Sequence, residues 1–435
     1  MTEIEKIASF WEEEGNYIFL RPEDNVLILP PNRVYKINAT AFKLISYLKQ
    51  GEAVQSLFAS LTNKEHYDQS LLFFNTLYGL CSGDEEADSL IERIPFTFSY
   101  TSLPILGEIA VTYRCNNKCL FCYAGCNSGE TLLRKKIQKK EMSTKDLFTI
   151  IDTFKHQAKI PFFSFTGGEP LLRTDLEQCI SYAVSNKLAV NLVSNGTLAS
   201  KERAQSLFTA GLRTAQISIE SSEEDMHNYL TGSPGSFKAT VEGIKNLIDE
   251  GISVQTNTTI TNISAEHMKK MPSFLKNLGI KKFAMNMFIP SGSGLYHEEL
   301  FIPYNEIGNI VEQVRKEAFT EGLTFYWYSP TPLCMYNPVA KGLGNKNCAA
   351  CDGLISISPS GDLLPCSSWD GNVGNVLKKG FQKTWFSKEA RKIKNKEFAP
   401  QVCKSCSSFT ACQGACPLYW NYCGTELLNS AGGKR

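Results

Sequence analysis

"GEIAVTYRCNNKCLFCYAGC", residues 107–126, joins an apolar, strand-like run to a closely spaced group of cysteines. Cys115, Cys119 and Cys122 follow the spacing C-x3-C-x2-C, and Cys126 comes shortly after them. Thiolates at this spacing suit either zinc or an iron–sulfur cluster. A structural zinc ion would need a fourth ligand, which Cys126 could supply. A four-iron cubane needs only three thiolates if its fourth iron is kept for a substrate or cofactor.

The sequence beyond this stretch alternates between strands and helices. Strand-like apolar runs occur at GEIAVTY (107–113), PFFSF (161–165), AVNLVS (189–194), TAQISI (214–219), SVQTNTTI (253–260) and KFAMNMF (282–288). Helical stretches lie between them, as in STKDLFTIIDTFKHQ (143–157) and SFKATVEGIKNLIDEG (236–251). This alternation predicts an α/β fold with a parallel sheet and crossover helices. Six such units make an open or closed β/α barrel, with the chemistry at the C-terminal ends of the strands.

Length and composition limit the protein class. A chain of 435 residues predicts two or three domains. Its net charge of +1 gives no reason to expect a nucleic acid or membrane partner. There is no run of about 18 apolar residues, and the N-terminus has no signal-peptide pattern. We therefore expect a cytoplasmic protein, in which 15 cysteines are unlikely to form disulfides.

Three further segments, each after its own predicted strand, extend the pattern begun by the cysteines. They are FTGGEP (165–170), SNGT (194–197) and ISIES (217–221). Together with C-x3-C-x2-C and the aromatic Phe121 before its last cysteine, they resemble the radical S-adenosylmethionine enzymes. The resemblance covers roughly residues 105–290. It favours the iron–sulfur alternative over zinc at the first cysteine group.

The resemblance implies a set of cofactor ligands. Cys115, Cys119 and Cys122 would hold three irons of a 4Fe-4S cluster, and the fourth iron would bind S-adenosylmethionine. The residues implied around S-adenosylmethionine are Gly167, Gly168, Glu169, Pro170, Ser194, Asn195, Ser218 and Glu220. The glycines would let the backbone approach the ligand, and Glu169 would accept hydrogen bonds from the methionine ammonium group. Tyr123 would pack near the adenine or serve as a core aromatic.

The resemblance also implies the chemistry. An external one-electron donor of the flavodoxin or ferredoxin type would reduce the cluster, and cleavage of the sulfonium would release a 5′-deoxyadenosyl radical. That radical would take a hydrogen atom from the substrate. In HNYLTGSPGSF (227–237) the family's usual Asp and Arg are replaced by Asn228 and Thr231. The substrate-side contacts of those two positions are therefore not carried over to this chain.

The C-terminal region holds the remaining large group of cysteines. Four of them follow C-x2-C-x5-C-x3-C, with another cysteine after them and three upstream. Zinc ribbons fit cysteines of this kind, but the arrangement resembles the SPASM extension of radical enzymes, which implies two auxiliary 4Fe-4S clusters. The first would be held by Cys348, Cys351, Cys366 and Cys416, and the second by Cys403, Cys406, Cys412 and Cys423. Cys334 is an alternative ligand or a free thiol, and Cys126 is interpreted as a free thiol.

The first 95 residues predict a small winged-helix-like module. Three short strands fall in residues 16–22, 25–31 and 32–38, and Asn38 or Thr40 begins the first of three helices. The segment resembles the peptide-binding chaperone of pyrroloquinoline quinone biosynthesis, which recognises leader peptides. A leader would then add as an extra strand to the exposed edge of the module. A DNA-binding winged helix is the alternative, but the stretch lacks the basic face that DNA requires.

These observations predict a radical S-adenosylmethionine maturase. Its parts would be a leader-binding module (1–95), a radical barrel (96–330) and a SPASM domain with two auxiliary clusters (331–435). The substrate would be a ribosomally made precursor peptide carrying a leader, and the product a thioether or carbon–carbon crosslink. Two alternatives remain open: modification of a tetrapyrrole or other small molecule, and a non-catalytic iron–sulfur scaffold.

Overall fold

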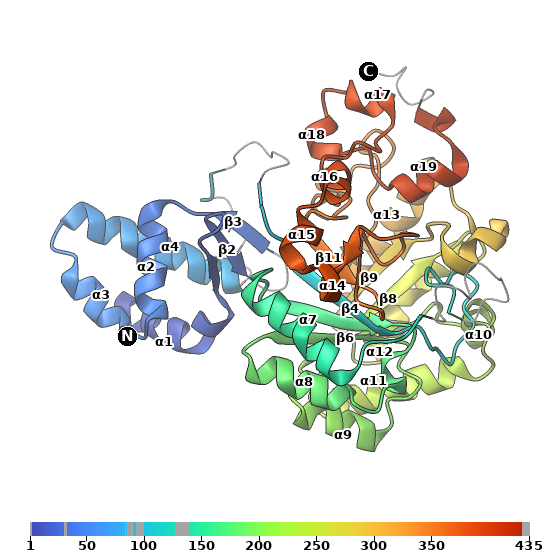
Figure 1. Cartoon of the computed structure of the whole chain (residues 1–435), viewed down its shortest axis with the longest axis horizontal. Helices are drawn as coiled ribbons and strands as arrows, with labels where there is room; N and C mark the ends of the chain where they lie inside the picture. The colour runs from blue at the N-terminus through green and yellow to red at the C-terminus, as the bar shows by residue number, and fades with distance from the viewer. Residues whose placement is uncertain are drawn as a thin grey trace. The chain divides into compact units, whose positions relative to one another are not determined.

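The computed structural model describes residues 2–29, 33–82, 84, 87, 90–92, 100–126 and 139–428. The chain divides into two compact units, residues 1–105 and residues 106–435 (Figure 1). Among the helices in the described ranges, none combines the length and apolar character needed to cross a bilayer.

The N-terminal unit combines a small antiparallel sheet with helices. The strands are β1 (Phe19–Arg21), β2 (Val26–Leu29) and β3 (Arg33–Lys36), and the helices are α1 (Glu3–Glu14), α2 (Ala39–Lys49), α3 (Val54–Ser60) and α4 (Lys64–Ser82). The sheet order β1-β2-β3 places β2 in the middle. The three predicted strands and three predicted helices are confirmed. Asn38 caps α2, because its Oδ1 accepts a hydrogen bond of 2.8 Å from the Ala41 N–H.

Helix α1 was not predicted, since only the acidic charge of this stretch was considered. A capping box starts the helix: the Thr2 hydroxyl accepts from the Glu5 N–H, and the Glu5 carboxylate accepts from the Thr2 N–H. The apolar residues Ile7 and Phe10 lie three positions apart and are buried. This spacing places both on one face of a helix.

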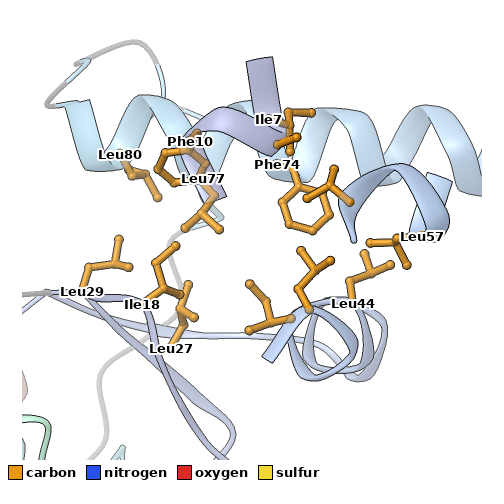
Figure 2. Packing of buried hydrophobic residues seen from close by; sticks show 14 of the residues in the cluster. Ile7, Phe10, Ile18, Leu27, Leu29, Leu44, Leu57, Phe74, Leu77 and Leu80 are labelled. Atoms are coloured by element: carbon orange, nitrogen blue, oxygen red, sulfur yellow. The ribbon is translucent and has the colours of Figure 1, made fainter. Parts of the chain in front are cut away.

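The core of the N-terminal unit lies between the sheet and the helices. Figure 2 shows Leu27 and Leu29 of β2 pointing toward Phe10 of α1 and Leu77 of α4. Leu27 and Leu29 share one face of the strand because side chains alternate along it. All four side chains are buried, and each such burial stabilises the fold by about 1.5–3 kcal/mol. The unit therefore has a hydrophobic core of its own.

The second unit is built on a parallel sheet. Its first strands are β4 (Leu106–Thr112), β5 (Phe162–Gly167), β6 (Ala189–Ser194), β7 (Thr214–Ser218), β8 (Ser253–Ile260) and β9 (Lys282–Met287), which pair in chain order. All six predicted strands are confirmed, as is the α/β fold class. The strands run parallel because helical crossovers between β5 and β9 return the chain to the same end of the sheet.

Helices cover the outer face of this sheet. They are α7 (Thr144–His156), α8 (Leu176–Ser185), α9 (Lys201–Thr209), α10 (Glu224–Thr231), α11 (Ser236–Asp249), α12 (Met271–Asn277) and α13 (Tyr304–Glu321). In Figure 1, α7, α8, α9 and α11 follow one another in green below the strands. Short helices complete the C-terminal region: α14 (Val376–Lys379), α15 (Phe381–Trp385), α16 (Lys388–Lys394), α17 (Gln401–Lys404), α18 (Phe409–Cys412) and α19 (Pro417–Cys423).

The sheet continues beyond the six predicted strands at both edges. Strand β10 (Thr324–Trp327) lies parallel to β9. At the other edge β11 (Leu354–Ile357) lies parallel to β4, followed by the antiparallel strands β12 (Asp362–Leu364) and β13 (Gly374–Asn375). The cysteine-rich region therefore contributes strands to the same sheet as the radical motifs.

Candidate active site

The C-x3-C-x2-C cysteines lie on the loop that follows β4, at the C-terminal edge of the sheet. Backbone hydrogen bonds hold this loop against the end of α10: the Lys118 N–H donates to the Thr231 carbonyl at 2.9 Å, and the Leu120 N–H donates to the Leu230 carbonyl at 3.0 Å. All three cysteines line one cavity of about 390 Å³. The loop position agrees with the prediction that the chemistry lies where the strands end.

The cysteines of this loop are partly or fully buried and close to one another. Burial raises the pKa of Cys115 to about 11, and both burial and the neighbouring Cys122 raise that of Cys119. A hydrogen bond from the Cys126 thiol lowers the pKa of Cys122 to about 6. Buried thiols become stable thiolates when a metal supplies positive charge, so the residues fit an iron–sulfur cluster. Among the described side chains, no three Cys, His, Asp or Glu converge as ligands of a single metal ion.

Gly167, the last residue of β5, and Gly168 after it are packed against the cysteine loop. A Cβ atom on Gly167 would lie 2.2 Å from the Thr112 carbonyl oxygen, and one on Gly168 would lie 2.3 Å from that of Arg114. Gly167 also has a φ of +136°, which L side chains rarely adopt. The Gly168 N–H donates to the Thr112 carbonyl at 2.8 Å. Only glycine lets the two loops lie this close, and both glycines line the cavity.

The Glu169 carboxylate is fully buried and occupied by hydrogen bonds within the protein. It accepts from the Ser194 hydroxyl at 2.8 Å, the Asn195 N–H at 2.8 Å and the Leu171 N–H at 3.0 Å. Glu169 therefore holds the end of β6 and its loop against the loop that follows β5. Among the described residues, neither Glu169 nor Pro170 lines the cavity.

The other residues predicted around S-adenosylmethionine do line the cavity; they are Tyr123, Ser194, Asn195, Ser218 and Glu220. The Tyr123 hydroxyl donates to the Gly167 carbonyl at 3.2 Å, so the tyrosine connects the cysteine loop to the glycines. The Glu220 carboxylate accepts from the Thr259 N–H at 2.8 Å. Burial raises the pKa of Glu220 to about 8. The structure thus brings residues from four strand ends to one cavity.

The two positions that depart from the family pattern have structural partners. Asn228 accepts hydrogen bonds through Oδ1 from the Ser236 hydroxyl and the Phe237 N–H, at 3.1 and 3.0 Å. The Thr231 hydroxyl donates to the His227 carbonyl at 2.8 Å. The contacts of Asn228, and a 2.7 Å hydrogen bond between the Thr231 and Ser236 hydroxyls, join the end of α10 to the start of α11. Neither residue places a charge in the cavity.

Several cavity residues were not found from the sequence. They are polar side chains inside the sheet, among them Glu108, Gln216, Asn257, Asn286 and Tyr328. Glu108 of β4 accepts a hydrogen bond of 2.5 Å from the Ser356 hydroxyl of β11. Burial raises its pKa, while hydrogen bonds from Ser356 and Ser367 oppose the rise. A signal for these residues was present in the sequence. Polar residues stand at alternate positions of strands that should otherwise be apolar on both faces.

The first auxiliary set is partly assembled in the structure. Burial raises the pKa of Cys366 and, to about 12, that of Cys416, and the nearby Cys348 adds to both rises. Cys351 is buried, and its N–H donates to the Pro365 carbonyl, next to Cys366. Two buried and two partly buried thiols in one region fit the donor set of an iron–sulfur cluster. Ser367 and Ser368, directly after Cys366, line the cavity.

The second auxiliary set lies on the short helices α17 to α19. The Cys406 N–H donates to the Cys403 carbonyl at 3.0 Å, which places these two cysteines on one turn. The Cys412 sulfur accepts from the Leu333 N–H at 3.4 Å, beside Cys334. Cys423 ends α19, where its thiol donates to the Gly424 carbonyl. The assignment of these cysteines to one cluster stays a prediction.

Comparison with known protein families identifies two segments. Residues 109–278 match the radical SAM superfamily. Residues 348–407 match SPASM, an iron–sulfur cluster-binding domain. The two segments contain the first cysteine loop and most cysteines of the C-terminal region.

Curated relatives divide between two kinds of named activity. The chain is 27% identical over 334 residues to an AdoMet-dependent heme synthase of Nitratidesulfovibrio vulgaris, covering 73% of this chain and 88% of that protein. It is 26% identical over 333 residues to the antilisterial bacteriocin subtilosin biosynthesis protein AlbA of Bacillus subtilis, covering 74% and 67%. Sequence identity alone does not choose between them.

The fold is similar to that of Streptococcus suis SuiB, solved with S-adenosylmethionine and also with its precursor peptide SuiA. The first comparison gives a TM-score of 0.69 at 18% identity, covering 93% of this chain and 97% of SuiB. The second gives 0.67 at 16%, covering 93% and 95%. The second unit makes up about three quarters of the chain, so the shared fold includes most of the N-terminal unit.

Proposed function

The chain is a radical S-adenosylmethionine enzyme with a SPASM domain, and from this premise we propose that it modifies a ribosomally made precursor peptide by forming a thioether or carbon–carbon crosslink. When bound, the cluster and S-adenosylmethionine supply a carbon radical that takes a hydrogen atom from the substrate. Cys115, Cys119 and Cys122 would hold that cluster. Asn195, Ser218 and Glu220 would orient the cofactor in the cavity.

The N-terminal unit carries the proposal, because β3 is an end strand to which a leader peptide could add. Strand β3 is at the end of its sheet, and within the described residues no strand lies on its other side. The Ile37 N–H donates to the Asn25 carbonyl beside β2. Alternate residues of a strand direct their backbone groups to opposite sides, so those of Val34 and Lys36 face away from β2. The Val34 carbonyl accepts a long hydrogen bond of 3.4 Å from the Tyr100 hydroxyl, which a peptide strand would replace. A peptide strand could pair there.

The cavity in the second unit also favours a peptide over a tetrapyrrole. Its described lining contains two carboxylates, Glu108 and Glu220, and no lysine, arginine or histidine. Haem-type tetrapyrroles carry propionate carboxylates, which would need cationic or strongly donating partners once removed from water. A peptide backbone brings neutral hydrogen-bonding groups, which the amide and hydroxyl side chains of this lining can accommodate. Tetrapyrrole modification nevertheless stays the second candidate, because relatives with that named activity match the chain.

A non-catalytic iron–sulfur scaffold is the least supported alternative. A scaffold needs its cysteines but has no need of a cavity beside them. Here loops from β5, β6 and β7 meet the cysteine loop around such a cavity. This arrangement supports a bound small cofactor and therefore turnover.

The experiment tests the strand edge directly with Val34→Pro. Proline removes one outward-facing N–H and leaves the hydrogen bonds between β2 and β3 in place. The probes are leader-bearing precursor peptides, chosen by searching for short open reading frames beside this gene. Loss of one backbone hydrogen bond costs about 1 kcal/mol, so the peptide's Kd should rise about fivefold or more. Crosslinking should fall in parallel.

Val34→Ala is the matched control, because it shortens the same side chain but keeps the N–H. It should bind the leader more tightly than Val34→Pro. Reductive cleavage of S-adenosylmethionine without peptide should be equal in both variants. Equal Kd values would reject leader binding at β3. Turnover of a tetrapyrrole with no turnover of any leader-bearing peptide would favour the second candidate.

A further inference from the structure

Lys396 is a lysine with no solvent-exposed surface, which is rare in folded proteins. It lies just beyond α16 with a φ of +56°, and its N–H donates to the Ile393 carbonyl at 3.0 Å. Removing an ammonium group from water costs several kcal/mol unless an anion and hydrogen bonds replace the water. The surroundings of Lys396 should therefore contain negative charge.

The carboxylate near Lys396 compensates it poorly. Among the described residues, only Asp352 has a carboxylate within 4.0 Å of the Lys396 Nζ, at 3.9 Å. Asp352 is closer to the Nζ of Lys394, at 3.4 Å. The shorter contact of Lys396 is with a backbone oxygen: its Nζ donates a hydrogen bond to the Cys348 carbonyl at 2.6 Å. The ammonium is thus directed at the cysteine-bearing loop.

Two cysteines of the first auxiliary set, Cys348 and Cys351, lie beside this ammonium group. Burial raises the pKa of Cys351 to about 12, and the positive charge of Lys396 opposes the rise, so the two groups are close. Cys348 lies next to Cys366 and Cys416. A 4Fe-4S cluster held by four thiolates has a net negative charge, which increases by one unit on reduction. Such a cluster would supply the anion that Lys396 lacks.

We propose that Lys396 is the buried counter-ion of the first auxiliary cluster and raises its reduction potential. A fixed positive charge in a low-dielectric region stabilises the more negative, reduced state more than the oxidised one. The cluster then accepts an electron more readily than it would without the lysine. This inference rests on the SPASM cysteines and is independent of the substrate. It can be confirmed or rejected independently of the peptide assignment.

The test measures reduction potentials by mediated titration of the anaerobically reconstituted protein, followed by electron paramagnetic resonance. The relevant signal is the one that is missing from Cys366→Ala. Lys396→Met keeps the length of the side chain and removes its charge. We expect at least a tenfold decrease in the equilibrium constant for reduction, which is about 59 mV for one electron. Lys396→Arg should stay within about twofold of the wild type.

Lys394→Met is the matched control, because it removes the closer partner of Asp352 from a partly exposed position. In this control, the equilibrium constant for reduction should change by less than about twofold. An unchanged potential in Lys396→Met with full iron content would overturn the proposal. So would a shift of equal size in Lys394→Met.

A second comparison applies if Lys396→Met loses iron, since that variant leaves the partly buried Asp352 with Lys394 as its nearby cation. Asp352→Asn combined with Lys396→Met removes both charges and is compared with Asp352→Asn alone. A lower potential in the double variant supports the proposal, and equal potentials overturn it. If both Lys396→Met proteins lose the cluster, retention of iron in Lys396→Arg supports the role of the charge. Loss of iron in Lys396→Arg as well would indicate a packing role and overturn the proposal.

Discussion

Gly243 lies on α11 and does not line the cavity. Gly243→Ala should nevertheless impair the cofactor site. A Cβ atom at Gly243 would lie 2.0 Å from the Gly196 carbonyl oxygen and 3.3 Å from the Ala199 Cβ. An ordinary contact of this kind begins at 3.4 Å, so helix and loop must separate by about 1.4 Å, as expected for an overpacked interior. The obstructing atom belongs to the backbone. No change of side-chain rotamer relieves the contact.

Two effects oppose each other in this variant. Alanine favours a helix over glycine by about 1 kcal/mol, while overpacking costs about 1–3 kcal/mol, so the net loss of stability should not exceed about 2 kcal/mol. The displaced loop, however, carries Asn195, whose carbonyl accepts from the Thr240 hydroxyl of α11 at 2.9 Å. Asn195 lines the cavity. Misplacing a positioning group by about 1 Å costs about 10²-fold in rate.

The assay is reductive cleavage of S-adenosylmethionine by the anaerobic protein, which requires no peptide. We expect about a 10²-fold lower rate, unchanged iron content and an unchanged far-ultraviolet circular dichroism spectrum. Glu242→Ala and Lys245→Ala, on the exposed face of α11, are the controls and should cleave at the wild-type rate. A Gly243→Ala rate within threefold of the wild type would refute the reasoning. It would mean that the loop can move without disturbing the cofactor.

Four further predictions concern the clusters, the leader module and Glu169. Reconstituted protein should bind about twelve irons, and changing the three C-x3-C-x2-C cysteines to Ala should remove about four of them; loss of all iron would mean that the sites form one cooperative unit. Cys351→Ala should lose part of the iron and of the product formation while reductive S-adenosylmethionine cleavage continues; full iron with full turnover would show that Cys351 is not a ligand. Removing residues 1–95 should leave that cleavage largely unchanged and sharply reduce peptide crosslinking, which equal activity on leader-bearing peptide would contradict. Glu169→Gln places a donor opposite the Asn195 N–H and should lower the free energy of unfolding of the second unit by about 2 kcal/mol in urea denaturation; Glu202→Gln, fully exposed, is the control, and equal midpoints would be the contrary result.

Much of the second unit could be predicted from the sequence, because its signals are local. Each of the six central strands is a short apolar run bounded by turn residues, and helical periodicity separates most of them. The first cysteine loop and the glycines of residues 165–170 follow their own strands directly. Their meeting at one cavity then follows from the parallel sheet, because every strand of this kind ends at the same edge.

The remaining features depend on contacts that local sequence does not encode. The pairing of β11 with β4 joins segments about 250 residues apart, with Glu108 and Ser356 bonded across it. Lys396 follows a short, basic helix and resembles an ordinary surface lysine until the fold buries it. Glu169 was expected to accept hydrogen bonds from the methionine ammonium group, and that role stays a prediction. Its three hydrogen-bond donors come from Leu171 and from the next strand's loop, whose positions only the folded structure reveals.

The pairing of β11 with β4 has a consequence for protein engineering. A chimera made by exchanging the C-terminal region at residue 331 would also exchange β11, the neighbour that covers one edge of β4. The donor strand would have to reproduce the register of Leu354 against Leu106 through Ile357 against Ile109. It would also need a hydroxyl opposite Glu108. A chimera that takes β4 and β11 from the same parent preserves this pairing. The junctions between parents should therefore lie before β4 or after β11 in the sequence, and not between the two strands.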